Sequence, residues 1–325
     1  MSKICIICGS NKFREVIRKS GCAMIKCLGC GLVFTDPLPT EQELDKYYQQ
    51  TYQVDLDGYF NKKSIFEYYL NCIESFAWKG RNLLEIGCSY GLFLKIARER
   101  GWQVNGIELS SEGRTYAETR FGLTVYDRKL KDTPLFVENR FDGVALWHVL
   151  EHFQNPYEEL QSINYCLKPG GIIAVVLPNF GSLQARSLNR YWEWIDPYAH
   201  LYQFDLSTLK KLLRKAGFEI VYQKTQRGDS KGLLAHIIYY FFRLICFGVK
   251  WSGIIYLKLR EKIGHTGTDN RIDQFKTNLG RYFEKVFWPV ILKMIRPVDY
   301  VTHMIRNLVY KKMLGPEMFV LAKKI

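Results

Sequence analysis

Four cysteines near the N-terminus are spaced in a way that favours metal binding. Cys5 and Cys8 form one C-x-x-C pair, and Cys27 and Cys30 form a second pair after 18 intervening residues. The tight turn at each pair directs two thiolates towards one ion, which is the arrangement of a structural zinc site. Four thiolates leave no open coordination position, so we expect no catalysis there. A redox-active cysteine pair is the alternative for these residues.

A second set of residues, between 85 and 108, could bind a nucleoside. The apolar run 82–86 contains Glu85 and ends at Gly87, and Gly91 follows before an amphipathic helical pattern. Glycine backbone lets a ligand approach closely, and the first N–H groups of a helix are free to bind it. Glu108 lies 21 residues after Gly87, at the end of the next apolar run. A carboxylate at that place can accept hydrogen bonds from both hydroxyls of a ribose.

The composition of the turn argues against a dinucleotide and for a ligand that carries a positive charge. A pyrophosphate is usually bound by the pattern G-x-G-x-x-G, whereas residues 87–91 read G-C-S-Y-G. The carboxylate of Glu85, immediately upstream, would repel a diphosphate at this position. The same carboxylate would attract an ammonium or another cationic group.

Three histidines are candidates for removing a proton from a substrate, namely His148, His152 and His200. His200 lies in an aromatic segment whose rings suit a sugar or an aromatic ring: Tyr191, Trp192, Trp194, Tyr198 and Tyr202. We favour His200 as the general base, with His152 and Tyr202 as further catalytic candidates. The alternatives are that His152 only holds its loop in place and that the aromatic segment is a loop packed on the core.

An alternation of strand and helix patterns positions these residues. Apolar runs of strand length lie at 82–86, 102–107, 123–126, 141–146, 172–177 and 218–224, with helical patterns between most of them. A longer helical pattern at 59–78 precedes the first run, and Thr40 with Glu43 predicts a capping box for a short helix. The alternation predicts a doubly wound α/β fold, in which ligands bind outside the carboxyl ends of the strands.

The order and spacing of five segments resemble those of the class I, Rossmann-like S-adenosylmethionine-dependent methyltransferases. The segments are E-x-G-C-x-x-G at 85–91, Glu108, F-D at 141–142, E-H at 151–152 and L-K-P-G-G at 167–171. The resemblance covers about residues 59–225. The N-terminal cysteine pairs resemble the zinc-ribbon branch of that family, which is found among bacterial sugar and glycan-related methyltransferases. The family fold implies a seven-stranded sheet, for which the apolar run at 317–323 would be the last strand.

The resemblance implies S-adenosylmethionine as the cofactor and a role for each matching residue. The methionine part would be surrounded by the glycine turn and the strand end before it: Glu85, Gly87, Cys88 and Gly91. Glu108 would bind the ribose. Leu109 and the segment that begins at Asp127 would enclose the adenine, and Trp147 and His148 would line the wall near the sulfonium.

The sequence indicates the methyl acceptor less clearly than it indicates the methyl donor. The sugar C-methyltransferases of the zinc-ribbon branch resemble this chain in the aromatic loop but carry a Glu-His pair there, whereas Ala199 precedes His200 here. The missing pair makes O-methylation the favoured reaction and C-methylation of a nucleotide sugar the alternative. A hypothesis of another class is a membrane-associated binding protein without turnover.

The segment 226–315 is predicted to be a basic, apolar helical insertion before the last strand. Between 231 and 315 there are 15 Lys and Arg residues against five Asp and Glu residues, so this segment carries +10 of the formal net charge of +14. Apolar stretches interleaved with Lys and Arg favour helices at an anionic membrane surface. A lid or a dimer contact is the alternative, and dispersed basic residues argue against nucleic acid.

The composition is that of a globular protein, with 325 residues, 47% hydrophobic and 24% charged. The predicted domains are a zinc ribbon at 1–40, a methyltransferase domain at 41–225, the insertion at 226–315 and the final strand at 316–325. We recognise no signal peptide and no apolar run of transmembrane length, and nine cysteines without such a signal indicate reduced or metal-bound thiols. We therefore expect a cytoplasmic protein, peripheral on the inner membrane face, that methylates a small-molecule, glycan or lipid-linked acceptor.

Overall fold

The computed structural model describes residues 3–51, 56–76, 80–226 and 314–325. It confirms the predicted seven-stranded α/β sheet. The strands in chain order are β4 (Asn82–Ile86), β5 (Gln103–Ile107), β6 (Val125–Tyr126), β7 (Phe141–Trp147), β8 (Leu167–Pro178), β10 (Phe218–Gln226) and β11 (Glu317–Lys324). Their order in space is β10-β11-β8-β7-β4-β5-β6, and β11 runs antiparallel to both its neighbours.

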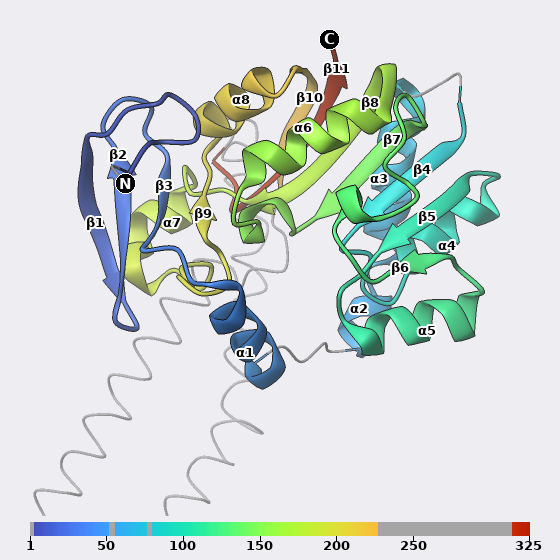
Figure 1. Ribbon diagram of the computed structural model, residues 1–325, viewed down its shortest axis with the longest axis horizontal. Coiled ribbons are helices and arrows are strands. Elements are labelled where there is room, and N and C mark those ends of the chain that lie inside the picture. The colour runs from blue at the N-terminus through green and yellow to red at the C-terminus, as the bar shows by residue number, and fades with distance from the viewer. Residues whose placement is uncertain (1–2, 52–55, 77–79, 227–313) are drawn as a thin grey trace, which may run out of the picture. The chain divides into compact units, whose positions relative to one another are not determined.

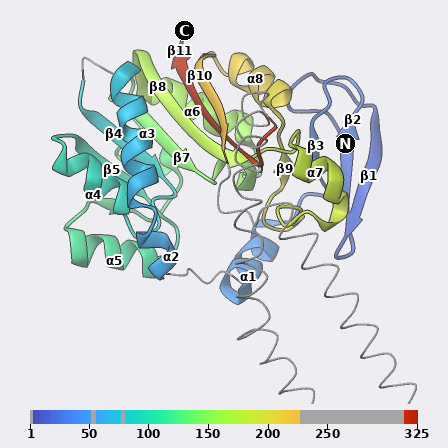
Figure 2. The same cartoon turned by 180° about the vertical axis from the view of Figure 1, so that it is seen from behind.

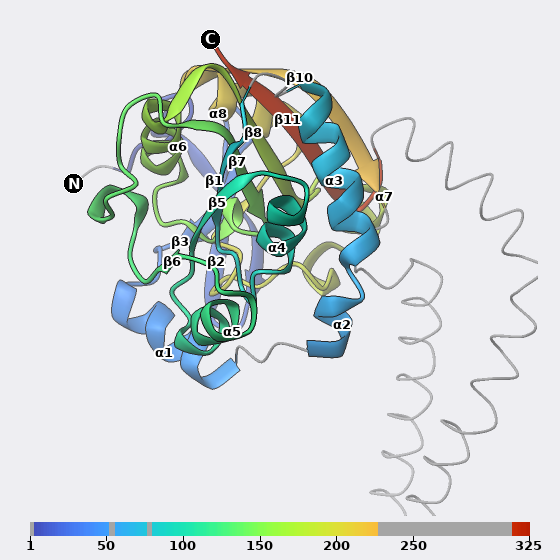
Figure 3. The same ribbon diagram turned by 90° about the vertical axis from the view of Figure 1, so that its right-hand side faces the viewer.

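Helices cover both faces of this sheet (Figures 1 and 2). On one face lie α3 (Lys63–Phe76) and α4 (Leu92–Glu99). The buried residues of α3 recur at helical spacing, so one stripe of the helix packs on the strands: Phe66, Tyr69, Leu70 and Ile73. On the other face lie α6 (Pro156–Cys166) and α8 (Leu206–Lys215). Figure 3 shows the sheet between α6 and α3, with α5 (Ser111–Phe121) after β5.

The helical pattern predicted at 59–78 is confirmed from Lys63 to Phe76, where it packs on the sheet, but its first residues belong to a separate helix, and residues 77–78 lie outside the described ones. α2 (Leu56–Phe60) ends in a turn where the N–H of Asn61 donates to the carbonyl of Asp57, and α3 begins at Lys63. The two helices therefore contact different parts of the molecule. Tyr59 of α2 reaches the glycine turn after β4, while α3 covers the sheet.

The N-terminal segment forms a second, antiparallel sheet. Its strands β1 (Phe13–Lys19), β2 (Cys22–Cys27) and β3 (Val33–Asp36) pair in chain order. The fourth strand is β9 (Tyr202–Gln203), which comes from the aromatic segment and pairs with β3. The predicted boundary at residue 40 therefore separates two parts of the sequence that share one sheet. The predicted capping box precedes α1 (Glu41–Thr51), where the N–H of Thr40 donates to Glu43 over 2.8 Å.

Four short elements complete the described chain: η1 (Leu130–Asp132), η2 (Leu150–His152), α7 (Leu183–Leu188) and η3 (Asn189–Tyr191). Most of the predicted insertion at 226–315 lies outside the described residues, which resume at 314. The strands on either side of it pair with each other, and Gln226 lies opposite Glu317. Among the described helices, none has the length and apolar character needed to cross a bilayer.

Candidate functional site

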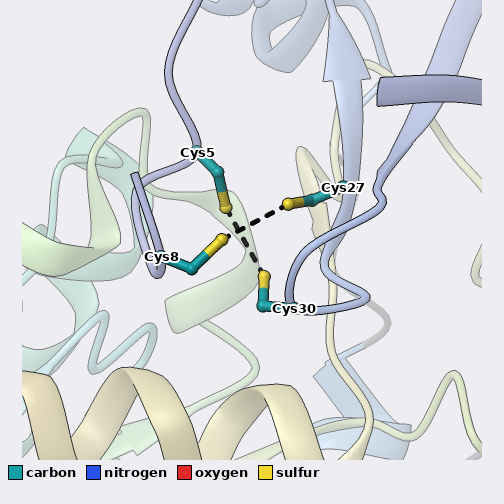
Figure 4. Close-up of side chains that lie close together, drawn as sticks. All are labelled: Cys5, Cys8, Cys27 and Cys30. Carbon is teal, nitrogen blue, oxygen red and sulfur yellow. Dashed lines mark hydrogen bonds between the residues drawn. The ribbon is translucent and has the colours of Figure 1, made fainter. Parts of the chain in front are cut away.

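The four predicted zinc ligands come together (Figure 4). The sulfur of Cys5 lies 3.5 Å from that of Cys30, and the sulfur of Cys8 lies 3.5 Å from that of Cys27. All four sulfur atoms are within 4.8 Å of one another. Thiolates that bind one tetrahedral zinc ion at about 2.3 Å are roughly 3.8 Å apart. The donor set and its spacing therefore fit a four-cysteine zinc site.

The two cysteine turns repeat one backbone geometry. The N–H of Gly9 donates to the carbonyl of Cys5 over 2.9 Å, and the N–H of Gly31 donates to the carbonyl of Cys27 over 3.0 Å. Both glycines have a positive φ, 72° and 92°, which other residues rarely adopt. Two equivalent turns, one from each end of the β1–β2 hairpin, thus hold the thiols in place.

The turn after β4 requires both of its glycines. Gly87 and Gly91 have φ values of 72° and 77°. A Cβ atom on Gly87 would lie 2.5 Å from the side chain of Val149, and one on Gly91 would lie 2.6 Å from that of Leu123. Because Val149 belongs to the loop after β7, the glycine turn is in direct contact with that loop.

Two carboxylates flank the glycine turn, and they differ in their hydrogen bonds. Glu85 is 2% exposed, and its Oε2 atom has no hydrogen-bond partner within the described part of the chain. Burial, and then the nearby charge of Glu108, hold the pKa of Glu85 well above its ordinary value. Glu108 accepts hydrogen bonds from the backbone N–H groups of Ser89 (2.7 Å) and Ser110 (2.8 Å), one on each oxygen. Each oxygen of Glu108 keeps a lone pair that could accept a ligand hydroxyl.

Tyr59 belongs to this site although the sequence analysis did not single it out. Its hydroxyl donates to the carbonyl of Cys88 (3.2 Å) and accepts from the N–H of Leu92 (3.1 Å) at the start of α4. It thereby ties the glycine turn to the helix that follows. Burial raises the pKa of Tyr59 well above its ordinary value, and the charge of Glu85 adds to this effect. The aromatic character of α2 was visible in the sequence, but its contact with a turn 30 residues later was not.

The remaining predicted cofactor residues lie in different surroundings. Leu109 is 65% exposed, directly after Glu108. Asp127 is exposed and pairs with Arg128 over 3.1 Å, which lowers the pKa of its carboxyl group. Both could border an adenine at an open edge of the sheet. Trp147 instead packs between rings of the α3 and α4 face, with its ring centre 4.8 Å from that of Tyr69.

His148, directly after β7, lies between two buried carboxylates. Its Nδ1 is 3.6 Å from Glu151 Oε1 and its Nε2 is 3.7 Å from Glu317 Oε1. Burial lowers the pKa of His148, but Glu317 and Glu151 outweigh it, so that the pKa is raised overall. The residue has a φ of 56°, an uncommon conformation that is often found at functional sites. Its ring stacks on Trp194, with 5.3 Å between ring centres.

His152 and His200 lie side by side although 48 positions separate them in the sequence. Their ring centres are 4.9 Å apart. His152 Nδ1 is 2.7 Å from the carbonyl of Ala199, and His200 Nδ1 is 2.7 Å from the carbonyl of Trp194. Burial, and then the neighbouring His152, lower the pKa of His200 to about 4. The structure thus brings together the loop after β7 and the aromatic segment, as one cluster.

Tyr202 and Glu317 complete the surroundings of this cluster. Tyr202 is buried in β9, where its hydroxyl donates to the carbonyl of Gln154 over 3.0 Å and its ring stacks on Phe34. Glu317, which the sequence analysis did not name as a site residue, opens β11 and is 2% exposed. A charged residue directly before the apolar run 318–322 was the available signal for Glu317.

A comparison with protein families identifies the central part of the chain. Residues 62–223 match the family model described as a methyltransferase domain. The matched range includes the glycine turn, Glu108, the loop after β7 and the aromatic segment.

Curated relatives share only part of their length with this chain. A protein from Caulobacter vibrioides named ubiquinone biosynthesis O-methyltransferase is 32% identical over 133 residues, which cover 38% of this chain and 52% of that protein. One of the same name from Actinobacillus pleuropneumoniae is 30% identical over 105 residues, covering 29% and 44%. The chain spans about half the length of the curated relatives it matches.

Solved structures of methyltransferases are also similar. An S-adenosylmethionine-dependent methyltransferase from Archaeoglobus fulgidus is 18% identical, with a TM-score of 0.47 over 83% of this chain and 100% of that chain. Phosphoethanolamine N-methyltransferase 2 from Haemonchus contortus, in complex with S-adenosylmethionine, is 18% identical, with a TM-score of 0.49 over 90% of this chain and 61% of that chain.

Proposed function

Residues 62–223 match a methyltransferase domain, and from this premise we propose that the chain is a class I S-adenosylmethionine-dependent methyltransferase that methylates an oxygen of a small-molecule, glycan or lipid-linked acceptor. The pair of carboxylates around the glycine turn carries the proposal for the donor. Glu85 offers a buried, unpaired oxygen to the ammonium of the methionine part. Glu108, held by two backbone N–H groups, offers its remaining lone pairs to the ribose hydroxyls.

The cofactor supplies a methyl group that is already activated by the sulfonium charge. The protein has to place the acceptor oxygen in line with the methyl–sulfur bond and to take up a proton. An acceptor hydroxyl would lose its proton to a base of this chain while its oxygen bonds to the methyl carbon. The methyl–sulfur bond would break with its electron pair left on sulfur, so that the cofactor would leave as S-adenosylhomocysteine.

We assign the base to His148 in preference to His200, which the sequence favoured. Val149, next to His148, is in contact with Gly87 of the donor turn. Glu151 and Glu317 lie on either side of the His148 ring and would stabilise the imidazolium that forms. His200 is 8% exposed, and its Nδ1 is held by a backbone carbonyl. It is therefore better suited to positioning than to proton transfer.

Oxygen as the acceptor atom is supported by the relatives that are named O-methyltransferases and by the absence of a Glu-His pair at His200. Of the aromatic rings in the 191–204 segment, Trp192 and Tyr202 are buried, whereas Tyr191 is exposed and Trp194 stacks on His148. The rings of Tyr191 and Trp194 are therefore the ones that we propose to border a sugar or an aromatic acceptor. The charge of +10 between 231 and 315 supports an acceptor at an anionic membrane surface on the cytoplasmic side.

The donor assignment is tested by calorimetric titration with S-adenosylmethionine. Glu108→Gln should weaken binding by about tenfold or more, because each hydrogen bond to a charged group contributes roughly 1.5–3 kcal/mol. Glu118→Gln removes the same charge from the exposed surface of α5 and should bind like the wild type. Absence of binding in the wild-type protein would remove the basis of the proposal.

A further inference from the structure

Glu151, His152 and His200 bring three potential metal ligands to one point, outside the cysteine cluster. One ligand atom from each lies within 4.8 Å of the others. Two of these residues come from the loop after β7 and one from the aromatic segment. Ligands around a single ion are about 3–3.5 Å apart when each bond is about 2.1 Å long. Small rotations of the side chains would therefore bring all three into one coordination sphere.

The two imidazole rings are oriented as metal-bound histidines usually are. Each Nδ1 lies 2.7 Å from a backbone carbonyl, that of Ala199 for His152 and that of Trp194 for His200. A carbonyl accepts only, so Nδ1 carries the proton and Nε2 carries the lone pair. A backbone or carboxylate acceptor on the far nitrogen is the usual partner that fixes the tautomer of a metal-binding histidine.

The carboxylate of Glu151 is buried without a hydrogen-bond donor. The side chain is 1% exposed, and neither oxygen accepts a hydrogen bond from any residue that the structure describes. The contact with His148 Nδ1, at 3.6 Å, is too long for a hydrogen bond. Leaving a buried carboxylate without donors is costly, and a cation bound to one of its oxygens would offset that cost.

From this arrangement we infer that Glu151, His152 and His200 bind a divalent transition-metal ion, separately from the zinc ribbon. Two imidazole nitrogens and one carboxylate oxygen suit Zn²⁺, Fe²⁺, Co²⁺ or Mn²⁺ and not the all-oxygen sites of Mg²⁺ and Ca²⁺. Three protein ligands leave at least one position for an oxygen from outside. A role for the ion, which rests on the proposed function, is to bind the acceptor oxygen at that open position and so orient it towards the methyl donor.

The site is tested by metal content and by cobalt spectra on the full-length protein, without cofactor or acceptor. Metal-stripped protein is saturated with Co²⁺, dialysed and analysed by mass spectrometry. The wild type should retain a second equivalent in addition to that of the ribbon. The spectrum of this second equivalent should lack sulfur-to-cobalt charge-transfer bands. Glu151→Gln should lose it, whereas the matched variant Glu317→Gln, which removes the other carboxylate beside His148, should keep it.

Two results would overturn the inference. One is that the wild-type protein retains a single equivalent of cobalt, whose spectrum shows only thiolate ligands. This result can be interpreted without any variant. The other is that a second equivalent of cobalt persists in the Glu151→Gln variant and also in the double variant His152→Asn/His200→Asn. Circular dichroism checks that both variants are folded. Because binding is measured without methyl transfer, failure here is distinguishable from failure of the proposed function.

Discussion

Glu85 is a carboxylate that folding buries near a second carboxylate, that of Glu108. We propose that the free energy lost by burying Glu85 is recovered when the cofactor binds. Its pKa is raised in the folded state, mainly by burial. The folded protein therefore holds this proton more tightly than the unfolded chain does. As the pH rises above the ordinary glutamate pKa of about 4.3, Glu85 progressively destabilises the cofactor-free protein, until its raised pKa is passed. The ammonium of the cofactor would compensate the charge.

Substitution of Glu85 should change the pH dependence and the affinity together. In Glu85→Gln, the decline of the melting temperature between about pH 5 and pH 8 should be smaller than in the wild type, because no proton is lost at this position. The affinity for S-adenosylmethionine should fall by about tenfold or more. Thermal unfolding across this pH range, together with calorimetry, measures both. Equal pH slopes in the two proteins would contradict the account, and Glu118→Gln is the surface control.

His148 is the residue whose loss should affect turnover most selectively. Replacement by Asn removes the proposed proton acceptor, so kcat should fall by about 10²- to 10⁴-fold. Cofactor affinity should change far less than in Glu108→Gln, since we propose that Glu108 binds the ribose and that His148 faces the acceptor. Single-turnover rates with labelled cofactor separate the two effects. Turnover close to that of the wild type would remove His148 as the base.

At the level of elements, the N-terminal sheet that carries the four cysteines is hydrogen-bonded to the aromatic segment around His200. Thr35 of β3 donates through its N–H to the carbonyl of Leu201 (2.8 Å) and through its hydroxyl to that of Pro197 (3.0 Å). β3 also pairs with β9. The glycine turn, by contrast, packs on Val149 and Leu123. The ribbon therefore holds the segment that carries His200.

Loss of the ribbon zinc should accordingly reduce turnover more than cofactor binding. Cys8→Ser removes one thiolate of the cluster and should release zinc, loosen the segment and lower kcat several-fold or more. The cofactor dissociation constant should stay within about threefold of the wild-type value, because the contacts of the glycine turn described above come from Val149 and Leu123 and not from the cysteine-bearing segment. Cys22→Ser changes a cysteine of the same sheet outside the cluster and serves as the control. Equal losses of turnover and cofactor affinity would show that the ribbon supports the whole domain.

At the scale of the whole molecule, the sheet does not depend on the 227–313 segment for continuity. β10 and β11 pair directly, and Gln226 lies opposite Glu317. Asn179 holds the chain just before β11, because its backbone N–H donates to the carbonyl of Pro316 (2.7 Å) and its side chain donates to that of Gly315 (2.8 Å). A short hairpin connection could therefore replace the segment without a change in strand register.

Such a replacement separates membrane association from cofactor binding. The full chain should float with vesicles that contain anionic lipid at low salt, and less so at high salt, because the attraction is screened. The shortened chain should stay at the bottom and bind S-adenosylmethionine within about threefold of the wild type. A full-length protein that fails to float at low salt would contradict the membrane proposal, and vesicles without anionic lipid are the control.

The sequence by itself determined the features that depend on neighbours along the chain. The spacing of the cysteines, the glycine turn with Glu85 and Glu108, and the alternation of strands and helices are local patterns, and each predicts its element without knowledge of the rest. The family resemblance supplied the last strand, β11, which no local pattern would have joined to the sheet across the intervening segment.

Only the tertiary structure decided which distant residues meet. Tyr59 lies over a turn some 30 positions later, His152 lies against His200, and Glu317 lies beside His148. These contacts arise because strands separated in sequence become neighbours in the sheet, so that the loops at their ends converge. The spacing of residues along the chain does not predict which loops will converge. For this reason the sequence favoured His200 as the base, whereas our proposal of His148 depends on contacts that only the folded chain forms.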